Sequence, residues 1–296
     1  MKRPTIGDIA RRAGVSKAAV SYALNGRPGV SEETRDRVSR IAHALGWRAN
    51  TAALALSGER AGVVGLVIAG PVPWATIEGI ERELAGDGIA LQLAITRGAE
   101  AEETYQDWWA TRRVDGVLVV DPQLDDHRIA LLHRLNVPTV LLNTTEPGMS
   151  GLQIDPRPAW SAVREHLARR GHRAIGYVGD QLSVGAELIQ VHGEPLEAIR
   201  RLRGEVTAVV FDDVLAAVEV VAHAAALGLR VPADLAIVAL GDAPVCRLVH
   251  PNITAVRHDE TAQGATAARL LLDQLKTGQP GQAVIHTHEL IVREST

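Results

Sequence analysis

Residues 5–24 have the pattern of two short helices joined by a glycine-bearing turn. Thr5 and Asp8 have the spacing of a capping box, which begins a helix, and Gly14 suits the left-handed backbone that ends one. Ser16 is placed to cap a second helix. Two short helices in this order form a helix-turn-helix, whose second helix enters the DNA major groove. The apolar residues at helical spacing that would hold the pair together are Ile6, Ile9, Ala10, Ala13, Val20, Ala23 and Leu24.

A third helix is expected directly after this pair. Ser31 is a candidate N-cap, and Glu32 and Glu33 place negative charge at the positive end of the helix. Gly46 would end it. Each helix alone could belong to any small helical bundle, but the three in this order favour a DNA-binding headpiece. The apolar stripe of the third helix is Val38, Ile41, Ala42 and Leu45.

Charge is divided unevenly along the chain. Residues 1–60 contain 11 Lys or Arg and 5 Asp or Glu, a net charge of +6, whereas the other residues include 20 basic and 30 acidic ones, a net charge of −10. The total of −4 therefore hides a basic segment on an acidic body. Such an asymmetry indicates a polyanion as the partner of the basic segment.

Residues 5–50 resemble the headpiece of the lactose/galactose repressor family of bacterial transcription regulators. The agreement is almost continuous and includes residues 13–16, 20–21, 24–26, 30–35 and 45–47. The resemblance implies a homodimeric repressor that binds a palindromic operator in double-stranded DNA. It implies that Lys17, Ala18 and Tyr22 on the second helix read bases. The other DNA contacts expected from the headpiece are Thr5, Ser16, Ser21, Asn25 and Ser31.

The segment from Asn50 to Gly58 is a short link that is too short to be a stable helix in water. It is either a simple linker or, as the resemblance implies, a hinge that orders on DNA, pairs with its copy and inserts a leucine into the minor groove. Leu56 has the position of that leucine, with Leu54 as the alternative. Asn50 and Ala53 are the remaining DNA contacts expected in the hinge.

After residue 60 the pattern changes to short β-rich runs that alternate with amphipathic helices. This alternation predicts parallel sheets with right-handed crossovers. There are too many units for one mononucleotide-binding half, so we expect an α/β core of two doubly wound subdomains. The expected strands are Val63–Ile68, Ile89–Ile95, Gly116–Val120, Pro138–Leu142, Ala174–Val178, Val206–Phe211 and Leu235–Leu240, and the expected helices include Ile77–Ala85, Glu102–Thr111, Trp160–Arg170 and Val214–Leu227.

The core also resembles the family's sensory core, which is similar to type I periplasmic sugar-binding proteins. The resemblance implies about three chain crossings between the subdomains, and a helix over 259–276 that returns to the N-terminal subdomain near the dimer interface. The expected domains are a helix-turn-helix headpiece at residues 1–49, a hinge at 50–60, and a ligand-binding-like dimerisation core at 61–296.

The core is shorter than the family pattern, and its polar groups are sparse. Only residues 181–205 separate two recognisable strands where the family has a helix, a strand and a second helix, so a helix-sized piece is missing. A sugar site needs many polar groups, because each unpaired buried hydroxyl weakens binding. A conventional monosaccharide inducer is therefore disfavoured. The candidate effector contacts are Trp74, Asp121, Asp213 and Asp242, although Trp74 could instead pack a surface and the aspartates could cap helices.

The chain offers no basis for catalysis, a cofactor or a metal. It has no glycine-rich phosphate loop, nucleophile elbow or zinc-ligand series. His286 and His288 are expected side by side in one strand, but they lack a third ligand, so solvated edge histidines are favoured. The single Cys246 is expected to be a small buried residue, and one of Trp108 and Trp109 to lie in the core. Without an apolar leader or a spanning run, we expect a cytoplasmic, nucleoid-associated protein.

These observations predict a DNA-binding transcription regulator that is not an enzyme. The expected partners are operator DNA, a second copy of the chain and a candidate small-molecule effector of unknown identity, with no membrane. One alternative is a regulator with a degenerate effector pocket that a protein partner controls, or that acts without effector. A sugar-binding protein without a DNA role is disfavoured by the basic headpiece.

Overall fold

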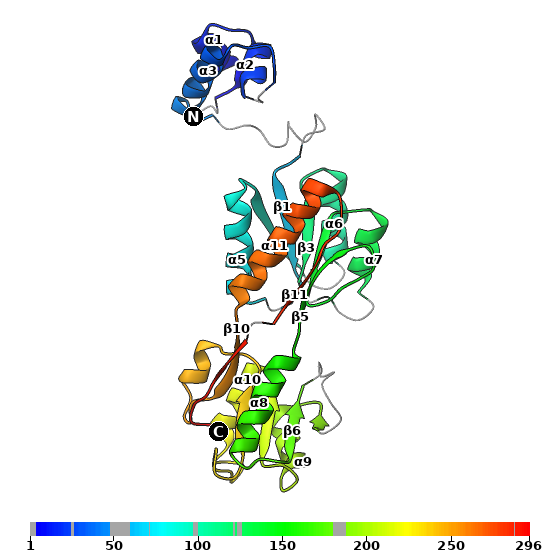
Figure 1. Ribbon diagram of the computed structural model, residues 1–296, viewed down its shortest axis with the longest axis vertical. Coiled ribbons are helices and arrows are strands. Elements are labelled where there is room, and N and C mark those ends of the chain that lie inside the picture. The colour runs from blue at the N-terminus through cyan, green and yellow to red at the C-terminus, as the bar shows by residue number, and fades with distance from the viewer. Residues whose placement is uncertain are drawn as a thin grey trace. The chain divides into compact units, whose positions relative to one another are not determined.

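The structure of the chain is a computed structural model that consists of two compact units. One contains residues 1–62 and 111–113, and the other contains residues 63–110 and 114–296 (Figure 1). The expected limits of the hinge stay a prediction, because most of its residues are not described. The residues that the structure describes are 4–24, 27–47, 60–70, 72–96, 100–120, 122, 126–179, 188–286 and 288–296.

The headpiece has the three predicted helices, α1 (Ile6–Ala13), α2 (Lys17–Leu24) and α3 (Glu32–Ala44). They pack around a small core in which Ile9, Val20 and Val38 are fully buried. Because each helix is too short to be stable alone, this shared core and the caps at the helix ends hold the headpiece together.

The predicted caps are present at the helix ends of the headpiece. The Thr5 amide donates to the Asp8 carboxylate at 2.8 Å, and the Asp8 amide donates to the Thr5 hydroxyl at 3.3 Å, which completes the capping box. Gly14 ends α1 with a φ of 67°. The Ser31 hydroxyl accepts the Thr34 amide at 3.3 Å and caps α3.

The first sheet of the core is entirely parallel, with the order β2-β1-β3-β4-β5-β11. Helices α5 and α11 pack on one face and α6 and α7 on the other, as two separate apolar clusters show. The elements are β1 (Val63–Ile68), α5 (Trp74–Gly86), β2 (Ala90–Ile95), α6 (Glu100–Ala110), β3 (Gly116–Val119), α7 (His127–Arg134), β4 (Thr139–Leu142), β5 (Ser150–Ile154), α11 (Glu260–Thr277) and β11 (Gln282–Ile285).

The second sheet has the order β7-β6-β8-β9-β10-β12, in which only the edge strand β12 is antiparallel. Helix α8 covers one face, and α9 and α10 cover the other. Leaving out the last edge strand, both sheets have the 2-1-3-4-5 order of a doubly wound fold. The elements are α8 (Arg157–Arg169), β6 (Ile175–Val178), β7 (Ile189–Val191), α9 (Pro195–Leu202), β8 (Ala208–Phe211), α10 (Val214–His223), β9 (Ala236–Ala239), the 3₁₀ helix η1 (Pro244–Arg247), β10 (Thr254–His258) and β12 (His288–Ile291).

The chain passes between the two sheets three times, as the resemblance implied. The chain crosses from one sheet to the other after β5, after β10 and after β11. Helix α11 follows the crossing after β10 and packs on the first sheet. All seven predicted strands are present with ends shifted by at most two residues. The predicted burial of Cys246 is confirmed, and Trp108 is the member of the Trp108–Trp109 pair that lies in the core. Strand β7 and helix α9 were not predicted. Both lie within residues 181–205, the stretch in which the shortening was expected.

One prediction about the C-terminal region is wrong. His286 and His288 do not share a strand, because β11 ends at Ile285 in the first sheet and β12 begins at His288 in the second. His286 lies 3.3 Å from the Asp155 carboxylate instead. Within the described part of the chain, no three metal-binding side chains form a group that could hold an ion.

Helices α5 and α11 touch through their backbones at two glycines. A Cβ atom at Gly79 would lie 2.0 Å from the carbonyl oxygen of Thr261, and one at Gly264 would lie 2.0 Å from that of Thr76. Neither distance is compatible with a side chain. The two glycines therefore set how closely the returning helix approaches α5.

We predict that Gly264→Ala lowers the free energy of unfolding by about 1–3 kcal/mol, because the added methyl group forces two backbones apart. Gly86→Ala is the matched control, since Gly86 ends α5 with nothing within 4 Å of its would-be Cβ atom. Alanine there is expected to be neutral or stabilising by up to about 1 kcal/mol. Urea unfolding measures the change in the free energy of unfolding for each of the two variants. Equal effects of the two substitutions would contradict the close-contact interpretation.

Candidate nucleic-acid interface and core pocket

The exposed face of α2 carries the residues predicted to read bases. Lys17, Ala18 and Tyr22 are exposed, whereas Val20 and Ala23 on the opposite side are buried in the headpiece core. Tyr22 presents 42% of its surface to solvent. Helical spacing thus places a cation, a small apolar group and an aromatic hydroxyl on one accessible face. These groups can donate to guanine, contact a thymine methyl group, or do both.

The other described headpiece candidates lie at helix starts. Thr5, Ser16 and Ser31 are exposed and act as caps, and the Ser16 hydroxyl accepts the Ala19 amide at 3.1 Å. Ser21 is half-buried on α2. The predicted Asn25, Asn50, Ala53, Leu54 and Leu56 lie outside the described residues, as does Asp121 of the core.

Arg35 of α3 was not singled out from the sequence, although it fixes the end of the recognition helix. Its guanidinium donates to the carbonyl oxygen of Ala23 at 3.5 Å and to that of Arg27 at 3.1 Å. These bonds tie the last turn of α2 and the following loop to α3. Arg35 therefore positions Tyr22 rather than extending into solvent.

The three described effector candidates are separated in the core. Trp74 begins α5 and is 73% exposed. Asp213 caps α10 by accepting the Leu215 amide at 2.9 Å. Asp242 follows β9 and its side chain is only 1% exposed. None of the three lines the pocket described below.

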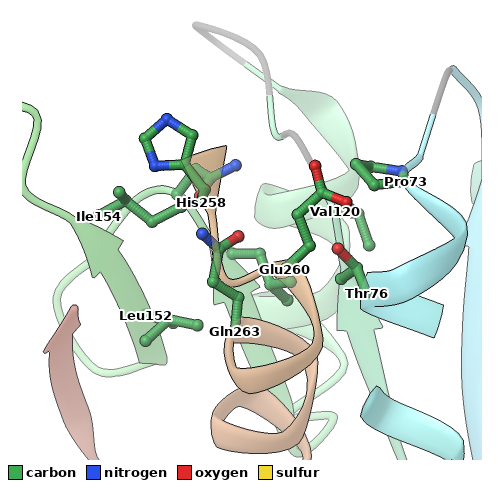
Figure 2. A pocket seen from close by; sticks show the side chains of 10 residues that line it. Pro73, Thr76, Val120, Leu152, Ile154, His258, Glu260 and Gln263 are labelled. Carbon is green, nitrogen blue, oxygen red and sulfur yellow. The ribbon is translucent and has the colours of Figure 1, made fainter. Parts of the chain in front are cut away.

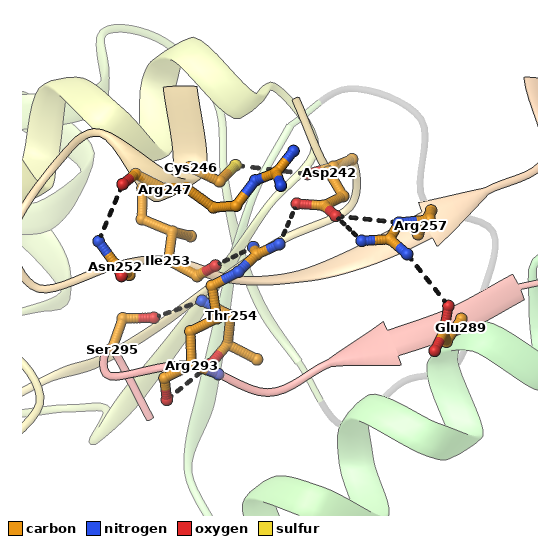
Figure 3. A network of polar contacts seen from close by, with 11 residues as sticks. Asp242, Cys246, Arg247, Asn252, Ile253, Thr254, Arg257, Glu289, Arg293 and Ser295 are labelled. Carbon is orange, nitrogen blue, oxygen red and sulfur yellow. Dashed lines mark hydrogen bonds and ion pairs between the residues drawn. The ribbon is translucent and has the colours of Figure 1, made fainter. Parts of the chain in front are cut away.

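Both carboxylate oxygens of Asp242 are held by arginines (Figure 3). Arg257 on β10 donates at 2.7 Å and Arg293 in the C-terminal segment donates at 2.6 Å, while Arg257 also pairs with Glu289 of β12 at 3.3 Å. Burial would raise the pKa of Asp242, but the arginine hydrogen bonds outweigh it and the pKa lies below its ordinary value. Asp242 therefore ties β10, β12 and the C-terminal segment together.

A pocket of about 160 Å³ lies at the carboxyl ends of β3, β4 and β5, where α11 begins (Figure 2). This edge is where doubly wound folds bind ligands. Apolar and polar side chains both line it, and α11 contributes Glu260 and Gln263. The residues that line the pocket are Pro73, Thr76, Val120, Leu142, Asn143, Leu152, Ile154, His258, Glu260 and Gln263.

Two polar atoms of the pocket lining are buried without a hydrogen-bond partner among the described residues. They are Nε2 of Gln263, a residue that is 8% exposed, and Nδ1 of His258. A buried polar group without a partner is costly, and such groups in a cavity point to a ligand or water that completes them. In Figure 2 the Gln263 amide and the Glu260 carboxylate extend from α11 toward the pocket.

Burial is the main cause of the pKa shifts of Glu260 and His258 in the pocket lining. Burial raises the pKa of the Glu260 carboxyl above its ordinary value. Burial, together with the charge of His288, lowers the pKa of His258, so its imidazole is neutral near pH 7. The part of the lining that the structure describes contains no lysine or arginine. Glu260, Gln263 and His258 were not predicted, because nothing local separates the first two from ordinary residues at a helix start, or His258 from an ordinary residue at the end of a strand.

Among the described helices, none has both the length and the apolar character that a membrane crossing requires.

The sequence matches two families of known proteins. Residues 5–50 match the bacterial regulatory proteins of the lacI family, and residues 185–296 match the periplasmic binding protein-like domain. The HTH-type transcriptional regulator MalR of Streptomyces coelicolor is 30% identical over 98% of this chain and 96% of its own length. CelR of Thermobifida fusca, also an HTH-type transcriptional regulator, is 30% identical over 99% of this chain and 98% of its own length.

Solved structures agree with these matches. The CelR–cellobiose complex has 26% sequence identity and a TM-score of 0.71 over 99% of this chain and 100% of that chain. The lac repressor dimer bound to operator and the anti-inducer ONPF has 22% identity and a TM-score of 0.81 over 100% of this chain and 99% of that chain, which shows the shared fold. The alignment with MalR spans 333 residues although this chain has 296, which fits a shortened core.

A helix-turn-helix headpiece followed by two parallel-sheet subdomains defines a DNA-binding transcription regulator with a periplasmic-binding-protein-like core. The curated relatives are regulators and not enzymes. The chain belongs to the lacI family of bacterial regulatory proteins.

Proposed function

We propose that the chain is a homodimeric repressor that binds a palindromic operator. The observation that supports this most directly is the exposed face of α2, which offers Lys17, Ala18 and Tyr22 on a basic headpiece. One headpiece reads only a few base pairs, too few for genomic specificity, so two copies are needed. The lac repressor, a structural relative, binds operator as a dimer. In this proposal Thr5, Ser16, Ser21, Asn25 and Ser31 support DNA binding by the headpiece.

The hinge completes the proposed interface. Leu56, with Leu54 as the alternative, would enter the minor groove at the centre of the operator, and Asn50 and Ala53 would contact DNA beside it. Two paired hinges would share the cost of unstacking one base step.

The core pocket is the proposed effector site. Its place at the carboxyl ends of the strands and its two unpartnered polar atoms support this assignment. The structural relative CelR was solved with cellobiose, which makes a small polar ligand reasonable here. A regulator that a protein partner controls, or that acts without effector, is the alternative. Trp74, Asp213 and Asp242 remain candidate contacts outside the described lining, and Asp121 remains a candidate contact that lies outside the described residues.

The first test of this proposal is selection of bound duplexes from a random library, combined with sedimentation. We expect an inverted repeat whose half-sites are about one helical turn apart, and a dimer at micromolar concentration. Enrichment of no sequence, or a chain that is monomeric both free and on DNA, would contradict the proposal.

The second prediction concerns Tyr22. Tyr22→Ala should weaken binding to the selected site by about 1–3 kcal/mol and relax base preference at one position of each half-site. Ser39→Ala on the exposed side of α3 is the control and should leave both unchanged. Fluorescence anisotropy with selected and random duplexes measures the effect. An equal loss on both duplexes would show that Tyr22 does not read bases.

A further inference from the structure

The pocket at the start of α11 has an unbalanced negative charge. Glu260 is the acidic residue among the described residues of the lining, which include no lysine or arginine, and the neighbouring His258 is neutral near pH 7. Among the described residues, no hydrogen bond or ion pair is found for the Glu260 carboxylate. A half-buried carboxylate without a cation is electrostatically unfavourable.

The charge of the pocket restricts what can occupy it. An anionic ligand such as a phosphorylated sugar would add repulsion to the cost of burying Glu260. A neutral polyol could pair with Gln263 and Thr76 but would leave the charge uncompensated. A protonated amine would donate to the Glu260 carboxylate as a charge-assisted hydrogen bond, which is stronger than a neutral one.

The remaining polar groups suit a compound that also has hydroxyl or carbonyl groups. The Gln263 amide needs an acceptor for its unpartnered Nε2, and Nδ1 of His258 can exchange a hydrogen bond with a hydroxyl group. The apolar side chains of Val120, Leu142 and Ile154 in the lining would pack against the carbon skeleton. The cavity of about 160 Å³ limits the ligand to a small molecule.

We propose that the effector of this chain is a small cationic polar compound whose protonated amine binds Glu260 and whose neutral polar groups bind Gln263 and His258. The inference rests on the proposed role of this pocket as the effector site. The proposed pocket differs from a general sugar site because the charge of Glu260 selects the ligand.

Matched pairs of probes test the proposal on the full chain by calorimetry at pH 6.5. D-glucosamine and D-glucose differ by one amine in place of a hydroxyl group, as do D-galactosamine and D-galactose, and glucose 6-phosphate supplies the anion. We expect at least one amine to bind at least about tenfold more tightly than its hydroxyl partner, and the phosphate to bind most weakly. Equal or tighter binding of the neutral sugars, or no binding of either amine at millimolar concentration, would overturn the proposal.

Glu260→Gln and Asp273→Asn separate a local effect from a general loss of negative charge. Both remove one negative charge from α11, but Asp273 is exposed and outside the pocket lining. Glu260→Gln should abolish the preference for the amine while thermal unfolding stays cooperative, and Asp273→Asn should retain the preference. Retention of the preference in Glu260→Gln would refute the role of this carboxylate.

Operator binding by the same preparations distinguishes the two proposals. A chain that selects an inverted repeat but shows no amine preference would refute only the ligand assignment. A chain without sequence preference on DNA would refute the proposed function, whatever binds in the pocket.

Discussion

The close contact between α5 and α11 is the constraint on which the core depends. Gly79 and Gly264 let two backbones meet where any side chain would collide. Helix α11 arrives from the second sheet, so this contact also attaches the passage after β10 to the first sheet. The same turns carry Thr76 and Gln263, two residues of the pocket lining. The spacing of the two helices therefore fixes how far apart Thr76 and Gln263 lie in the pocket.

The basic headpiece and the acidic core have different electrostatic roles. The basic headpiece can bind phosphates, and the acidic core avoids nonspecific attraction to DNA. Inside the core, charge is compensated where structure is needed, as at Asp242 between Arg257 and Arg293. No described residue compensates the charge of Glu260, where a ligand is proposed. The difference separates a carboxylate that holds strands together from one that is available for binding.

The sequence predicted those structural elements that are determined by residues adjacent in the chain. The capping box at Thr5 and the buried strands of both sheets follow from adjacent residues, and the family resemblance supplied the number of crossings. Strand β7 was missed because it is three residues long and partly exposed, and α9 because it is a short helix that starts at a proline. The pocket was missed for another reason. Glu260 and Gln263 acquire their surroundings only when α11 returns to the first sheet, so their sequence neighbours carry no signal.

The proposed function requires that the chain recognises a specific DNA sequence through two basic headpieces. The most direct measurement is the affinity for the selected duplex and for a random duplex as a function of salt concentration. Each phosphate contact contributes about −0.9 to the slope of log K against log salt, so several contacts from each headpiece predict a steep negative slope. We expect this slope for both duplexes, with tighter binding of the selected duplex at every salt concentration. Affinity that is independent of salt, or equal for both duplexes, would contradict the account.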